Sequence, residues 1–144
     1  MRKIWLLAVL VTSACSHDQS GKSVTLRTPE DFRTADTEML CADYGVRGGG
    51  AGEARTELVR RGVFTPAEMA AIDAHKLLVG LSECGVLAAL GTAPNRVTST
   101  TDNATGKVIQ VDYLYRCDRF PAPICPATNV TMRDGRVVYW GPSS

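Results

Sequence analysis

Residues 129–140 read NVTMRDGRVVYW, with apolar and polar side chains alternating on both sides of a central Asp-Gly pair. An Asp-Gly pair favours a type I′ turn, because both residues tolerate the positive φ angles of that turn. Alternation with a period of two is typical of strands that bury one face. The stretch therefore predicts an antiparallel hairpin that places Met132 opposite Val137. Farther from the turn, the same register places Val130 opposite Tyr139.

Two more strands are predicted before this hairpin. Residues 107–116 alternate in the same way, and residues 96–101 are their expected partner across a turn at 102–106. Four side chains are expected on one face of the longer strand, namely Ile109, Val111, Tyr113 and Tyr115. The sheet is thus predicted to have three to four antiparallel strands, with Tyr113 and Tyr139 in the core.

Helical patterns occupy the chain before residue 94. Short helices are expected at 37–44, 53–61, 65–76 and 82–90. The clearest start is TPAE at 65–68, a capping box with proline in the first turn. Helices first and strands afterwards predict the α+β class, with short N-terminal helices packed on the antiparallel sheet.

The first fifteen residues have the layout of an export signal. Arg2 and Lys3 precede eight apolar residues, and small residues then lead to Cys15. Such a series predicts a signal peptide over 1–14, and its apolar part is too short to span a bilayer, which takes about 20 residues. A cysteine after small residues resembles a lipobox, although Thr12 stands where an aliphatic residue is usual. We therefore expect cleavage before Cys15 and lipid attachment to it.

The rest of the chain is expected to form one domain behind this lipid anchor. Residues 15–36 form the lipidated cysteine and a flexible tether, 37–79 a helical part, 80–140 the sheet part, and 141–144 a tail. Stable anchoring takes two or more acyl chains, which a triacylated cysteine supplies. The resemblance to Gram-negative lipoproteins implies the outer membrane, facing the periplasm, because Ser16 rather than aspartate follows the cysteine.

The other four cysteines predict two disulfides, since they are even in number and the expected compartment is oxidising. Four cysteines allow three pairings. Cys117 and Cys125 bracket a proline-rich loop and form a natural local pair, which leaves Cys41 with Cys84. A zinc site is the rival interpretation, but the sequence has no Cys-x-x-Cys motif and only His75 lies beyond the tether. No metal and no cofactor are expected.

The sequence offers no pattern that predicts catalysis. A Gly-x-Ser-x-Gly elbow is absent, and no spacing brings Asp112 and Glu83 together as a carboxylate pair. His75 has no recognisable partner, so a hydrolase built around it is only an alternative. The net charge of +1 and the lack of a basic stripe argue against nucleic acid. We expect no catalytic residue, no small-molecule substrate, and a protein partner instead.

Two aromatic residues are predicted to anchor that partner. Phe120 lies on the proline-rich loop, and Trp140 lies near the C-terminus. Aromatic side chains are favoured anchors at protein interfaces.

Residues 80–140 resemble the SmpA or BamE domain, a small outer-membrane lipoprotein module of the β-barrel assembly machinery. The resemblance rests on GLS at 80–82, the apolar helix at 86–90, GTAP at 91–94 and DGRV at 134–137. Departures are Leu81 in place of methionine, one extra residue before Pro94, and the loop closed by the last two cysteines.

The resemblance implies an α-α-β-β-β module and a non-enzymatic protein-binding or scaffold role in outer-membrane protein assembly or envelope integrity. The alternative is an inhibitor or immunity-type lipoprotein that inserts the loop around Phe120 into a periplasmic hydrolase.

Cys15→Ser is expected to leave the protein unprocessed or to release it from the outer-membrane fraction, because the acyl chains would have no attachment point. Membrane fractionation and mass spectrometry of the mature N-terminus measure this. A mature N-terminus other than acylated Cys15 would contradict the prediction.

Overall fold

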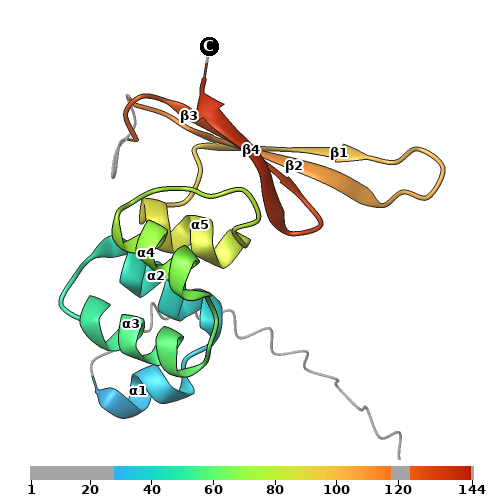
Figure 1. Ribbon diagram of the computed structural model, residues 1–144. Coiled ribbons are helices and arrows are strands. Elements are labelled where there is room, and N and C mark those ends of the chain that lie inside the picture. The colour runs from blue at the N-terminus through green and yellow to red at the C-terminus, as the bar shows by residue number, and fades with distance from the viewer. Residues whose placement is uncertain (1–27, 118–123, 144) are drawn as a thin grey trace, which may run out of the picture.

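The computed structural model describes residues 28–117 and 124–143, where five helices precede a four-stranded antiparallel sheet (Figure 1). The helices are α1 (Pro29–Thr34), α2 (Thr37–Val46), α3 (Ala51–Arg60), α4 (Pro66–Asp73) and α5 (Glu83–Leu90). The strands are β1 (Arg96–Thr101), β2 (Val108–Tyr115), β3 (Thr128–Arg133) and β4 (Arg136–Pro142), paired in that order. The predicted α+β class is confirmed.

Helix α1 lies within the range that was predicted to be a tether, so that prediction is wrong for Pro29–Thr34. Thr28 and Asp31 form a capping box, in which each side chain accepts from the backbone N–H of the other. Phe32 is buried and packs against Gly50, where a Cβ atom would come within 2.8 Å of the phenyl ring. A six-residue helix with one buried side chain is too short to show a periodic pattern of apolar residues. Its capping residues are therefore the feature of the sequence that indicates it.

The last hairpin follows the predicted register only near its turn. Met132 pairs with Val137, as predicted. The register then shifts, so that Val130 faces Trp140 and Thr131 faces Tyr139. A residue inserted into one strand in this way reverses the faces of the residues beyond it. The prediction that Tyr139 fills the core is therefore wrong, since it is 56% exposed, whereas Tyr113 is buried as predicted.

Helices α2 and α5 pack backbone against backbone. A Cβ atom on Gly45 would lie 2.4 Å from the carbonyl oxygen of Leu87 and 2.8 Å from Cα of Gly91. Gly91 also ends α5 with a φ of 70°, a left-handed conformation that suits glycine. The disulfide Cys41–Cys84 joins the same two helices with a Cα–Cα distance of 5.5 Å.

Both predicted disulfides are present. Besides the α2–α5 bond, Cys117 is bonded to Cys125. One hydrophobic core extends through the helices to the sheet, and its fully buried members include Leu40, Leu58, Ile72, Leu81, Val86, Val130 and Val137.

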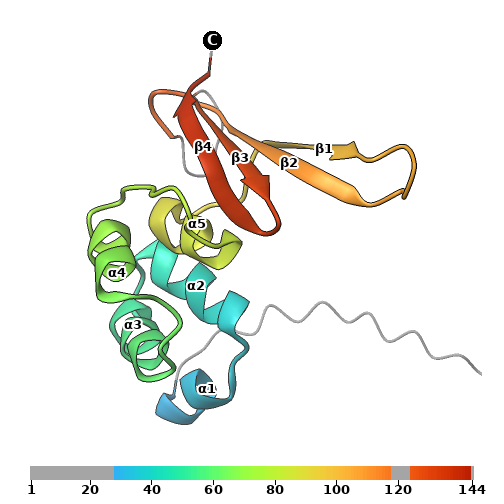
Figure 2. The ribbon, with the colours of Figure 1, turned by 45° about the vertical axis from the view of Figure 1, so that its right-hand side comes forward.

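Helix α5 is tied to the sheet through the segment before it. The Gly80 N–H donates to the Val137 carbonyl at 2.7 Å, and the Val137 N–H donates to the Leu81 carbonyl at 2.9 Å. The Ser82 hydroxyl then accepts from the Gly85 N–H and begins α5. The helices are stacked below the sheet, with α1 farthest from it (Figure 2).

A buried carboxylate holds α1 on α3. Glu57 is 5% exposed and accepts hydrogen bonds from Arg60 and from Arg61, the latter at 2.7 Å. Arg61 also donates to the carbonyls of Phe32 and Arg33 at the end of α1. In the part of the chain that the structure describes, no helix has the length and apolar character needed to cross a membrane.

Opening the Cys41–Cys84 disulfide by a double alanine substitution is expected to destabilise the protein more than opening Cys117–Cys125. Loop-closure entropy gives about 4 kcal/mol for the 43-residue separation and about 2.5 kcal/mol for the 8-residue separation. Cys41 is also fully buried. Urea unfolding of the two double variants measures the difference, and equal losses of unfolding free energy would contradict it.

Glu57→Gln is expected to lower the melting temperature at pH 7 but much less at pH 2.5. Hydrogen bonds from Arg60 and Arg61 lower the pKa of Glu57 to about 2 from its usual 4.5. A lowered carboxyl pKa stabilises the fold above pH 4.5, and this stabilisation is lost as the pH falls towards 2. Circular dichroism melts measure the effect. Glu53→Gln, at an exposed position on the same helix, is the control and should leave the melting temperature unchanged at both pH values.

Candidate functional site

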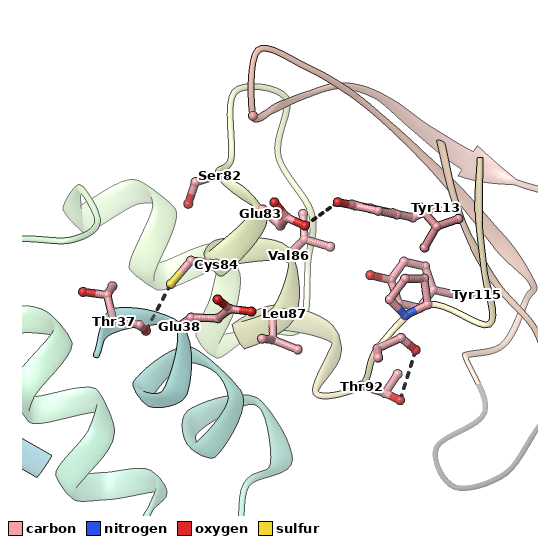
Figure 3. A pocket seen from close by; sticks show the side chains of 14 residues that line it. Thr37, Glu38, Ser82, Glu83, Cys84, Val86, Leu87, Thr92, Tyr113 and Tyr115 are labelled. Atoms are coloured by element: carbon pink, nitrogen blue, oxygen red, sulfur yellow. Dashed lines mark hydrogen bonds between the residues drawn. The ribbon is translucent and has the colours of Figure 1, made fainter. Parts of the chain in front are cut away.

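A cleft of about 820 Å³ lies between the helices α2 and α5 and the sheet, next to β1 and β2 (Figure 3). We call it the acidic cleft. Its polar side chains include Glu38, Glu83, Tyr113 and Tyr115, and its apolar wall includes Val86, Leu87, Pro94 and Val97. The described residues that line it include no lysine, arginine or histidine.

The capped start of α5 positions one of the two carboxylates. Glu83 follows the Ser82 cap and therefore occupies the first turn of the helix, on the side of the sheet. The Tyr113 hydroxyl donates a hydrogen bond to Glu83 Oε1 across the cleft (Figure 3). Burial, together with the negative charge of Glu83, raises the pKa of Tyr113. Tyr113 therefore stays protonated and holds the carboxylate in place.

Tyr115 points its hydroxyl into the same cleft (Figure 3). Tyr115 as a whole is 2% exposed. No residue within 28–117 or 124–143 forms a hydrogen bond with this hydroxyl. Burial is the main cause that raises the pKa of Tyr115, and Tyr113 and Glu83 add to it. The hydroxyl oxygen is not among the described side-chain atoms that are both buried and unpaired, so it is accessible from the cleft and can bind a group that enters it.

His75 and Asp112, the candidate catalytic residues besides Glu83, do not line the acidic cleft. His75 Nδ1 is 3.0 Å from the Ala89 carbonyl oxygen, and His75 does not line the cleft. Asp112 lies one residue before Tyr113 and hence on the opposite face of β2, where the Thr131 hydroxyl donates to it at 2.6 Å. Asp112 and Glu83 therefore have separate hydrogen-bond partners. Among the described residues, no cluster of three or more histidine, cysteine or acidic side chains could hold a metal ion.

A second candidate region lies along β4 and the segment just before residue 80. We call it the β4 edge surface, and it contains five exposed apolar side chains, on both faces of the strand: Leu78, Val79, Val138, Tyr139 and Trp140. β4 is the last strand of the sheet, and the segment at 80–82 bonds only to its beginning, at Arg136 and Val137. The bulge that overturned the predicted register is what exposes Tyr139 here. Phe120 and Cys15 lie outside the described residues.

Only part of these two surfaces can be predicted from the sequence. Residue type and position predict Trp140 as an anchor, and this stays a prediction. The meeting of Glu83 and Tyr113 depends on the packing of α5 against β2, thirty residues away in the sequence. The alternating pattern of β2 could have suggested that Tyr113 and Tyr115 share a face, but not what they face.

Comparisons with protein-family models, with curated proteins and with solved structures found no match for this chain.

Proposed function

We propose that this protein is a lipid-anchored lipoprotein of the outer membrane that faces the periplasm and binds another envelope protein without catalysing a reaction. The β4 edge surface carries the proposal. It places five large apolar side chains, all at least 37% exposed, beside the open edge of a sheet. Trp140 lies on the face of the sheet that bears the buried Val130, and Tyr139 lies on the opposite face, so apolar side chains flank this edge on both faces. Exposed apolar side chains beside a free strand edge favour a protein interface.

The edge of β4 also suits an extended segment of the partner. Beyond Val137, no strand among the described residues pairs with the outer side of β4. Edge strands offer backbone donors and acceptors to which another chain can add a strand. Trp140 would then serve as the aromatic anchor of the interface. This mode of binding fits a scaffold or assembly role.

Three features of the chain support the compartment and the process. The N-terminal series that ends at Cys15 supports a lipid anchor. Two disulfides support an oxidising compartment such as the periplasm. The resemblance of residues 80–140 to the SmpA or BamE domain supports outer-membrane protein assembly or envelope integrity as the process.

Trp140→Ala is expected to weaken binding to the partner by roughly thirty-fold, since an aromatic anchor contributes about 2 kcal/mol or more. The partner is first captured in living cells by a photo-crosslinking residue at position 138, and identified by mass spectrometry. The affinity of the purified pair is then measured for each variant.

Matched valine variants provide the control. Val138→Ala should weaken binding, whereas Val59→Ala should not, because Val59 is similarly exposed but lies on α3. Crosslinks from position 59 to the same protein, or an unchanged affinity in a folded Trp140→Ala variant, would contradict the proposal. Loss of cellular function in His75→Ala, with Trp140→Ala fully active, would favour a hydrolase instead.

A further inference from the structure

We propose that the acidic cleft receives a lysine or arginine side chain, carried between apolar residues on an extended segment of the protein partner. The inference rests on the proposed function in one respect only, that the partner is a protein. It concerns a different place from the β4 edge surface, which lines none of the cleft.

The charge of the cleft favours a cation. Glu38 and Glu83 both line it and are both exposed. The described residues that line the cleft include no lysine, arginine or histidine beside these two carboxylates. The hydrogen bond from Tyr113 fixes Glu83 Oε1, which leaves Oε2 to accept from an incoming ammonium or guanidinium group.

The Tyr115 hydroxyl supplies the second, independent observation. It is directed into the cleft, belongs to a residue that is 2% exposed, and has no hydrogen-bond partner among the described residues. The ring is packed in the core while the hydroxyl oxygen stays accessible from the cleft, since it is not among the buried unpaired atoms of the described residues. A lysine or arginine N–H group would satisfy the oxygen of this hydroxyl. The rings of Tyr113 and Tyr115 would also attract a cation that lies over their faces.

The apolar wall explains why the cation should belong to a peptide. Val86, Leu87, Pro94 and Val97 line the cleft, and its volume of about 820 Å³ exceeds that of a single side chain. Lysine and arginine carry long aliphatic stems that pack on such surfaces while their charged ends reach polar groups. Val97 is 56% exposed and would contact the apolar neighbours of the cation.

The test uses the purified full-length chain in detergent and three synthetic tetrapeptides of sequence Leu-X-Val-Leu, blocked at both ends. X is lysine, methionine or glutamate, so that length and apolar content stay similar. Chemical-shift changes of the tyrosine rings report binding. We expect the lysine peptide to bind about ten-fold more tightly than the glutamate peptide, with the methionine peptide between them.

Two variants locate the site. Glu83→Gln keeps an acceptor for Tyr113 and should weaken the lysine peptide about three- to five-fold, because a partly exposed ion pair is modest in energy. Tyr115→Phe keeps the ring and should also weaken it about five-fold, because it removes one hydrogen bond to a charged group. Glu53→Gln and Tyr139→Phe lie outside the cleft and should leave the affinity unchanged.

Three results would overturn the inference. One is equal binding of the lysine and glutamate peptides, and another is an unchanged affinity in both cleft variants. The third is binding of butylamine as tight as that of the lysine peptide, which would indicate a site for small amines. Trp140→Ala should not change peptide binding, so a failure of the proposed β4 interface can be distinguished from a failure of the cleft.

Discussion

Helices α2 and α5 approach so closely that their backbones touch at Gly45 and Gly91, where neither position has room for a side chain. The Cys41–Cys84 disulfide fixes the same pair covalently. Because α2 also packs on α3, this contact connects the lower helices to α5, which lies next to the sheet (Figure 2). The position of α5 therefore determines where the sheet lies relative to the other helices.

The acidic cleft follows from that position. Hydrogen bonds between Val137 and the segment at 80–81 hold the start of α5 against the end of the sheet that bears β4. On the side of β1 the sheet runs on past the helices, so the two layers separate (Figure 1). Glu83 and the two tyrosines of β2 occupy the point where the layers diverge. The acidic cleft and the β4 edge surface thus both lie next to the hydrogen bonds that join the segment before α5 to β4.

Sequence reasoning succeeded where a few neighbouring residues determine the structure. The capping box at Thr65, the cap at Ser82 and the turn at Asp134 each lie where the sequence predicted them. It failed where the outcome depends on residues far away. The bulge in β4 has no local signature among its valines and aromatics, and α1 buries only Phe32. The cleft itself depends on how two layers pack, which no spacing along the chain expresses.

The attachment of α1 sets how the chain would respond to tension. Arg61 donates hydrogen bonds to the carbonyls of Phe32 and Arg33 in α1, and Phe32 packs on Gly50. A pulling force applied before Thr28 would therefore act first on this short helix. That helix would detach first, followed by the first turn of α2. The detachment stops at Cys41, because the disulfide to Cys84 passes the load directly into α5. The fold thus contains a short first element followed by a covalent bond, beyond which a force on the N-terminus would reach α5 and its hydrogen bonds to β4.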